Sequence, residues 1–119
     1  MSDYEIKNVE WNSVIDAIEE CYSLGWTDGL PVVPPEQYRV QEFIDFVKRS
    51  PNEILGEVPE RRRQISVLKT AANAVMAGCL PEYFTVVVAA TEAMLTPEFN
   101  LIGPSSSQGG AAILVVVNG

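Results

Sequence analysis

The chain reads SVLKTAANAVMAGC over residues 66–79, and this stretch predicts a helix with many small side chains. The small residues in it are Ala71, Ala72, Ala74, Ala77 and Gly78. Small side chains let the backbone of a neighbouring element approach closely. A further helix is expected over residues 81–95, because Pro81 suits a first helical position and Glu82 lies near the positive end of the helix dipole.

Two more helices are predicted on the N-terminal side. Residues 12–24 repeat apolar side chains every three to four positions, with Asn12 or Ser13 able to cap the start and Gly25 able to end the helix. The apolar face consists of Val14, Ile15, Ile18, Cys21 and Tyr22. Residues 36–49 show the same period and stop before Pro51. Between and after these helices we expect a short extended segment at residues 30–33 and one helical turn at residues 52–56.

The C-terminal segment is a continuous apolar run. Residues 112–117 read AILVVV, which is typical of a strand buried on both faces rather than of a half-exposed strand. A buried strand needs neighbours at both edges, and this sequence offers few candidates. We therefore expect an α/β fold of three to four helices, with a short extended segment and a buried C-terminal strand. Another chain, or a missing continuation, would complete that strand.

Composition excludes several classes of function. With 119 residues the chain fits a single domain over 1–119, either a small subunit or the N-terminal piece of a larger fold. Acidic residues number 16 and Lys plus Arg 8, giving a net charge of −8, so this acidic protein is not expected to bind nucleic acid. There is no histidine, which excludes imidazole catalysis within the chain and the common zinc ligand sets, and no metal site is predicted.

The charge is distributed unevenly. Residues 1–60 carry 13 acids and 4 bases, whereas residues 61–119 carry 3 acids and 4 bases, and the last 21 residues carry no charge. A long uncharged end suggests burial within the fold or against a partner. The longest apolar run has seven residues, too few to span a bilayer, and the start does not resemble a signal peptide. Two cysteines 58 residues apart form neither a CxxC pair nor a disulfide framework, so a cytoplasmic location is expected.

Several blocks of the sequence resemble bacterial proteins associated with the UGSC-type family. These blocks are TDGLPVVPP at 27–35, LGEVP at 55–59, NAVMAGCLPEY at 73–83, PEFNL at 97–101 and VVNG at 116–119. The resemblance covers most of residues 24–119 and supplies a grouping rather than a mechanism. Members of that family continue past the position of Gly119. The Cys-Gly-Ser-Cys motif of the family is absent here, so no redox role or cofactor is carried over, and the cofactor is left unassigned.

Three residues are candidates for catalysis. Asp28 lies in a turn held by a proline-rich segment, where a carboxylate can act as a general base; the alternative is a turn in which it bonds its own backbone. Cys79 precedes a helix N-terminus, which favours a thiolate nucleophile; the alternative is an inert core thiol. Without histidine, the activating base would be Glu82 or a group supplied by a partner.

The main candidate for ligand binding is a loop rich in serine and glycine. Free backbone N–H groups and hydroxyls in such a loop can hold a carboxylate, a phosphate or an oxyanion, although a flexible connector is the alternative. The loop residues are Ser105, Ser106, Ser107, Gln108 and Gly109. Further ligand-binding candidates are Thr27, Tyr83, Asn100 and Asn73, the last of which is expected to be buried and to need a partner.

These features favour a small subunit of a heteromeric small-molecule enzyme with its active site at the subunit interface. The expected partner is a second protein subunit or another copy of the chain, and neither nucleic acid nor membrane is expected to bind. One alternative is a noncatalytic partner that stabilises or regulates a larger subunit. Another is the N-terminal fragment of a self-processed precursor. Substrate and reaction are not identified by the sequence.

Overall fold

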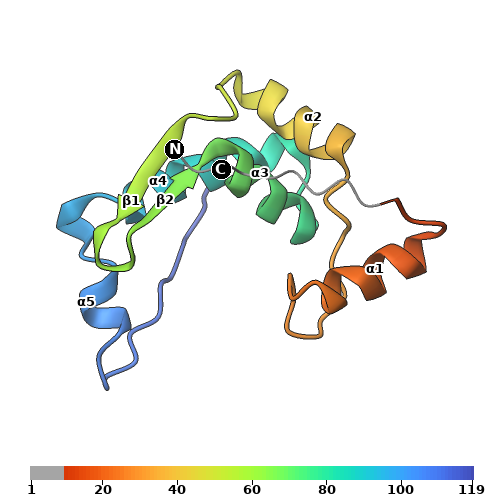
Figure 1. The fold of residues 1–119 in the computed structure, drawn as a ribbon. Helices are drawn as coiled ribbons and strands as arrows, with labels where there is room; N and C mark the ends of the chain where they lie inside the picture. Colours follow the sequence, from red (N-terminus) through yellow and green to blue (C-terminus); the bar gives the residue numbers. More distant parts are fainter. Residues whose placement is uncertain (1–9) are drawn as a thin grey trace. The chain divides into compact units, whose positions relative to one another are not determined.

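The computed structural model describes residues 10–119, and in this part of the chain it shows five α-helices and one pair of β-strands (Figure 1). The chain divides into two units, Met1–Pro34 and Pro35–Gly119, which are taken in turn. The combination of helices with an antiparallel pair of strands makes this a small mixed α/β fold, which agrees with the fold class predicted from the sequence. No helix of the described residues is long and apolar enough to cross a membrane.

The first unit contains helix α1, Val14–Ser23. The Asp16 N–H donates a 3.1 Å hydrogen bond to Ser13 Oγ, which confirms Ser13 as the N-cap, and Gly25 takes the left-handed conformation at φ 73° that ends the helix. Of the predicted apolar face, Cys21 is fully buried. Val14 and Ile15 are exposed, so only part of that face is covered. Residues 30–33 form no hydrogen-bonded strand.

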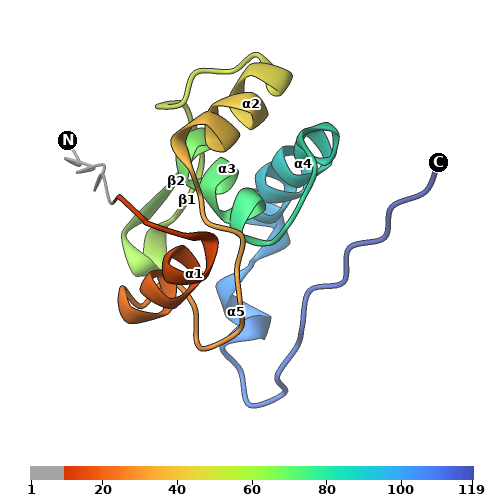
Figure 2. The same cartoon turned by 90° about the vertical axis from the view of Figure 1, so that its right-hand side faces the viewer.

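The core of the second unit is built by three helices: α2 (Gln37–Val47), α3 (Val67–Met76) and α4 (Phe84–Met94) (Figure 2). Their shared interior consists of Val40, Phe43, Ile44, Val67, Ala71, Ala74, Val75, Phe84 and Val88. The Phe43 and Phe84 rings meet edge to face, with centroids 5.6 Å apart and planes at 62°. All three helices lie inside the ranges predicted from the sequence.

Helix α3 packs against both α2 and α4, and its small residues allow both helices to approach it closely. Ala71 and Ala74 are buried, so the helix contributes little bulk on the side where the other two approach. Its N-cap is Ser66, whose Oγ accepts a 3.2 Å hydrogen bond from the Lys69 N–H. The stretch of small residues therefore forms the central helix of the second unit.

A β-hairpin occupies residues where the sequence analysis expected helix or loop. Strand β1 (Ile54–Val58) pairs with β2 (Arg63–Ser66) in antiparallel register, with an irregularity between Ile54 and Gly56. The connection is the 3₁₀ turn η1, Pro59–Arg61, after which Arg62 is left-handed at φ 49°. The helical turn predicted at residues 52–56 is therefore wrong. Pairing with β2 supplies those backbone groups with partners that a single helical turn could not.

The helix predicted at residues 81–95 begins with a different geometry. Its first turn is the 3₁₀ segment η2, Pro81–Tyr83, and α4 proper starts at Phe84. Helix α4 ends at Met94 and is followed by the 3₁₀ turn η3, Pro97–Phe99, and the short helix α5, Ile102–Ser105.

The last ten residues form no strand in this structure. After α5 the chain runs as an extended trace, and the side chains of residues 111–119 are exposed (Figure 2). The predicted buried strand is therefore not formed within this chain. The physical reason is that, among residues 10–119, no backbone segment forms hydrogen bonds with residues 111–119, and a strand needs such a neighbour. Completion of the strand by another chain stays a prediction.

Candidate functional site

The turn that carries Thr27 and Asp28 is organised by the threonine hydroxyl. Thr27 Oγ1 donates a 2.8 Å hydrogen bond to the Leu30 carbonyl and accepts a 3.3 Å bond from the Gly29 N–H. Gly29 has φ 129°, a conformation that suits glycine. Thr27 is thus engaged in holding the turn, and Asp28 is exposed beside it. The geometry leaves the Asp28 carboxylate open to solvent and to a ligand.

A hollow of about 340 Å³ adjoins this turn in the first unit. It lies between α1 and the segment after the turn, and its lining consists of Ile18, Glu19, Tyr22, Gly29, Leu30 and Pro31. The lining combines apolar side chains with polar groups, among them the Glu19 carboxylate. The sequence prediction named the turn but not this hollow, because the hollow arises only when the segment folds back along α1.

Cys79 lies at the junction between α3 and α4 in the second unit. Its N–H donates a 3.1 Å hydrogen bond to the Ala74 carbonyl, and the preceding Gly78 is left-handed at φ 82°, which ends α3. The Cys79 side chain is partly buried against the core. Glu82 and Tyr83 follow in the exposed turn η2. One short segment therefore holds a partly accessible thiol, a carboxylate and a phenol.

The two cysteines have different surroundings. Cys21 is fully buried on α1, and this burial raises the pKa of its thiol, which disfavours the reactive thiolate. Cys79 retains some exposure and both thiols are free. The assignment of Cys21 to the apolar face of this helix is confirmed by its burial.

Asn73 is not the buried amide that the sequence analysis expected. It is exposed on α3, and its Nδ2 donates a 2.8 Å hydrogen bond to the Lys69 carbonyl one turn earlier. Ala71 and Ala74 lie on the buried side of α3, whereas Asn73 lies on the exposed side. Its location within a run of small residues therefore did not imply burial.

The serine- and glycine-rich loop is partly helical. Ser105 belongs to α5 and its hydroxyl donates to the Leu101 carbonyl, while the Ser107 hydroxyl donates a 2.7 Å bond to the Pro104 carbonyl. These hydroxyls are engaged with the local backbone. The N–H groups of Gln108 and Gly109, by contrast, donate no hydrogen bond within the described chain.

Asn100 precedes the same region in the chain and packs against it. It adopts the left-handed conformation at φ 53° after η3. A β-carbon added at Gly103 would lie 2.5 Å from Asn100 Nδ2, so the Asn100 side chain packs directly on that glycine. This contact indicates a structural role for Asn100 in positioning α5. Ser106 and its neighbours on the loop are exposed.

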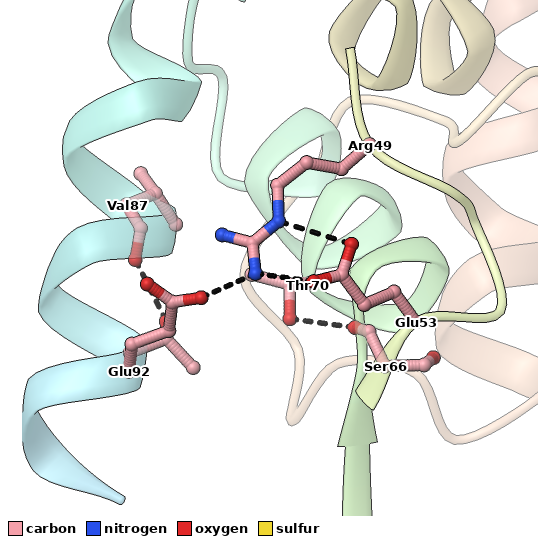
Figure 3. Close-up of polar contacts among 7 residues, drawn as sticks. Arg49, Glu53, Ser66, Thr70, Val87 and Glu92 are labelled. Carbon is pink, nitrogen blue, oxygen red and sulfur yellow. Dashed lines mark hydrogen bonds and ion pairs between the residues drawn. The ribbon is translucent and has the colours of Figure 1, made fainter. Parts of the chain in front are cut away.

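A three-residue ion cluster that the sequence analysis did not identify joins α4 to the segment before β1 (Figure 3). Arg49 Nη2 lies 2.6 Å from Glu53 Oε1 and 2.5 Å from Glu92 Oε1, and Arg49 Nε donates a 3.1 Å bond to Glu53 Oε2. Hydrogen bonding to Arg49 lowers the pKa of the Glu53 carboxyl below its ordinary value. The spacing of Arg49 and Glu53 was visible in the sequence, but Glu92 is 39 residues further on.

Beside this cluster lies a second hollow, of about 350 Å³, between α2 and α4. Its apolar lining comes from both helices, with Arg49 and Glu92 at one end. The residues that line it are Phe46, Val47, Arg49, Thr85, Val88, Ala89 and Glu92. We call this feature the α2–α4 groove.

Most of the candidate residues fall into three local groups, whereas Asn73 on α3 and Asn100 after η3 lie outside them. Thr27 and Asp28 belong to the first unit, and Cys79, Glu82 and Tyr83 share one segment of the second unit. The loop residues that follow α5 form the third group. Among residues 10–119 there is no group of three or more cysteine, aspartate or glutamate side chains arranged to hold a metal ion.

Within each unit of this small mixed α/β fold, the candidate residues form local groups. Comparison with known proteins finds no matching family model, no similar curated protein and no similar solved structure.

Proposed function

We propose that this chain is a subunit of a small-molecule enzyme whose active site is completed by a second polypeptide. The observation that carries the proposal is the exposed apolar segment at residues 111–117, which directly follows the loop at residues 105–110. Exposed apolar stretches of this kind mark interaction sites. A partner bound there would lie next to the loop and would enclose it.

The chemistry available to such a site would come from backbone N–H groups, a thiol and a carboxylate. The N–H groups of Gln108 and Gly109 can donate to a carboxylate, a phosphate or an oxyanion. Cys79 can supply a nucleophile, and Glu82 an acid or base three residues further along the chain. Because the chain contains no histidine, an imidazole base would have to come from the partner.

A noncatalytic role is the second candidate, and a specific observation favours it. The side chains of Thr27, Asn73 and Ser107 are hydrogen-bonded to nearby backbone groups, as expected of residues that hold turns and helix ends. In this second proposal the chain stabilises or regulates a larger subunit. The grouping with UGSC-type-associated bacterial proteins is compatible with both candidates and stays a proposal.

Purification of the chain from its native cells, followed by intact mass spectrometry under native conditions, tests the assembly. We expect the 13.0 kDa chain to be recovered with a second polypeptide at fixed stoichiometry. Recovery as a free monomer would contradict the proposal. A larger covalent species with this chain at its N-terminal end would instead support the processed precursor.

Alkylation of Cys79 in the assembled and the isolated chain separates the two candidates. If Cys79 lies in an interfacial active site, assembly should change its alkylation rate, and Glu82→Gln should change that rate again because it removes a neighbouring carboxylate. Glu60→Gln, an exposed change in the turn η1, is the matched control. Equal rates in both states and in all variants would favour the noncatalytic role.

A further inference from the structure

We infer that the turn of the β-hairpin binds an acidic segment of the second polypeptide through Arg61, Arg62 and Arg63. This inference rests on the proposed function, because it gives the chemistry of the surface that the second polypeptide presents to this chain. Arg61 ends the turn η1, Arg62 follows it, and Arg63 begins β2, at the end of the hairpin away from α2 (Figure 1). We call these three residues the arginine tip.

The three arginine side chains are exposed, and none of them forms a hydrogen bond or an ion pair within residues 10–119. The chain has 16 acidic residues and 8 Lys and Arg residues, so carboxylates are abundant relative to bases. Arg39 Nε lies 3.3 Å from Glu36 Oε2, and Arg49 pairs with Glu53. The guanidinium groups of the arginine tip, by contrast, keep their N–H donors available to a ligand.

The neighbouring carboxylates do not neutralise the arginine tip. Glu57 Oε1 accepts a 2.7 Å hydrogen bond from Gln64 Nε2 across the hairpin. Glu60 is exposed next to Arg61 in the chain, and Glu98 lies in η3, after the helix that packs on β1. Neither Glu60 nor Glu98 forms an ion pair within residues 10–119. These acids reduce the positive charge around the tip, but they do not occupy its donors.

The hairpin carries a charge opposite to that of the chain before it. Residues 54–66 hold three arginines and two glutamates, a net charge of +1, whereas residues 1–53 hold 4 bases and 11 acids, a net charge of −7. No acid follows Arg63 until Glu82. An acidic ligand is therefore attracted to the hairpin and repelled by the acidic residues that precede it in the sequence.

The backbone at Arg62 indicates that the side chain of this residue has a role. Arg62 is left-handed, with φ 49° and ψ 44°, a conformation that glycine and asparagine adopt at lower cost. Glycine at this position would therefore form the same turn more readily. Residues with side chains in such conformations concentrate at functional sites. The feature that arginine adds to the turn is its charged group.

The ligand that fits these donors is a short run of carboxylates. Guanidinium groups pair with carboxylates and phosphates through two parallel hydrogen bonds. The arginine tip lines neither of the two hollows described above, so these hollows would not enclose a small anion bound to it. Anionic membranes are recognised by clusters of about four to eight bases, and an extended polyanion would also approach the acidic residues of the chain. A protein segment with a few acidic side chains can contact the tip alone.

NMR titration of the ¹⁵N-labelled full chain with a hexaglutamate peptide, acetylated and amidated at its ends, tests the inference. Exposed ion pairs contribute more to the rate and orientation of association than to affinity, so binding should be weak and fast. At low salt we expect the largest chemical-shift changes at the backbone amides and Nε–H groups of the arginine tip. Added salt should diminish these changes, and a hexaglutamine peptide should cause none.

Two double variants with the same change in net charge give the matched comparison. Arg61→Gln with Arg62→Gln should raise the dissociation constant for hexaglutamate about fivefold, as expected for the loss of two exposed ion pairs. Arg39→Gln with Lys48→Gln also removes two exposed bases, and it should leave that constant within about twofold. Arg63 is retained because it belongs to the paired part of β2. Unchanged amide shifts in α2, α3 and α4 establish that the variants keep their fold.

Several results would overturn the inference. These are shift changes spread over all bases, no change at the arginine tip, or the same loss of affinity in both double variants. A thirty-nucleotide oligothymidylate and vesicles of anionic lipid should not bind at physiological salt, and binding of either through the arginine tip would favour a polyanion instead. Self-association of the chain that is abolished by Arg61→Gln with Arg62→Gln would make a second copy the partner.

The titration uses the chain alone, so its outcome does not depend on the recovery of a partner from cells. If a second polypeptide is recovered but the arginine tip does not respond to hexaglutamate, the inference is wrong and the proposed function stands. If the tip responds and the chain is recovered as a free monomer, the proposed function is wrong and the tip is a site for acidic ligands without it.

Discussion

Leu95 packs directly on Gly56, and this contact fixes the end of α4 against strand β1. A β-carbon built at Gly56 would lie 2.5 Å from the Leu95 Cβ and 2.9 Å from its Cδ1. Such distances do not occur between real atoms without displacement of one of them. The strand therefore approaches the helix as closely as it does because residue 56 has no side chain.

Gly56→Ala is expected to lower the free energy of unfolding by about 1–3 kcal/mol, since the added methyl group must displace Leu95 or the strand. Urea denaturation followed by circular dichroism measures the change. In the Leu95→Gly background, which removes the Cβ as well as the rest of the side chain, the same substitution should cost less, and the difference gives the coupling between the two positions. Gly109→Ala, in an exposed turn where the nearest atom is 3.4 Å away, is the matched control. Equal effects at the two glycines would show that the close contact is not formed.

The Phe43–Phe84 pair gives a second prediction about stability. Phe84 is fully buried, so Phe84→Ala should cost about 3–5 kcal/mol through lost burial and a cavity next to Phe43. Phe99→Ala, at a ring that is 45% exposed, should cost clearly less. Thermal or urea denaturation of both variants provides the comparison. A similar loss at the two sites would mean that α4 does not pack on α2 through Phe84.

The helices at residues 12–24 and 36–49 were predictable because each repeats its apolar residues at the helical period and has a stop signal after it. The helix at 66–79 was predicted from its small residues, and the helix at 81–95 from Pro81 and Glu82 at its start. Gly25 ends α1 as expected, and Gly78, which the sequence marked only as a small residue, ends α3 in the same left-handed conformation. The hairpin escaped prediction because its turn depends on Arg62 in a left-handed conformation, where no glycine or asparagine marks it. Its strands are also short, with five and four residues.

The candidate site was predictable only in its local parts. The turn at Thr27 and the junction at Cys79 follow from glycine and proline positions within a few residues. The ion pair between Arg49 and Glu92 depends on tertiary packing across 43 residues of sequence, which no local pattern encodes. The exposure of Asn73 likewise depends on which side of α3 the neighbouring helices cover.

The Arg49–Glu53 contact predicts a pH dependence of stability. Because Arg49 lowers the Glu53 pKa from its ordinary 4.5, the folded state gains stability that is fully present above pH 4.5 and is lost as the pH falls through the lowered value. Wild type should therefore exceed Glu53→Gln in unfolding free energy near neutral pH, with the difference shrinking below pH 4.5. Both side chains are partly exposed, so added salt should also reduce the difference.

Arg49→Gln provides the matched variant for that titration, because it removes the partner and keeps Glu53. Urea denaturation at several pH values between 3 and 7 should give this variant the same flattened pH profile as Glu53→Gln. If the unfolding free energy still falls steeply at acid pH in both variants, the pH dependence comes from other groups.

The two thiols should differ in reactivity. Cys79 is partly exposed, whereas Cys21 is fully buried and burial raises the pKa of its thiol. Iodoacetamide should therefore label Cys79 first in the native chain, and Cys21 only when the chain unfolds. Peptide mapping after timed alkylation measures the order, and labelling in urea is the control that both thiols are chemically competent. Faster labelling of Cys21 in the native chain would contradict the structure of α1.

Removal of residues 111–119 tests whether this segment stabilises the fold of its own chain or binds to another chain. Six buried aliphatic side chains would contribute on the order of 10 kcal/mol, comparable with the stability of a whole domain. In this structure, however, the side chains from Ile113 to Val117 are exposed and belong to no buried core cluster. The truncated chain, ending at Gly110, should therefore keep its unfolding free energy to within about 0.5 kcal/mol when both proteins are compared as monomers.

The same truncation should remove an exposed apolar surface, so the truncated protein should bind less of the dye ANS. It should also aggregate more slowly, because an unpaired apolar segment offers a backbone edge to which further chains can bind. Replacement of residues 111–119 by a glycine–serine segment of equal length is the control for chain length, and it should behave like the truncation. A loss of several kcal/mol in the monomer would show instead that the segment folds onto its own chain, and the assembly argument would then lose its main observation.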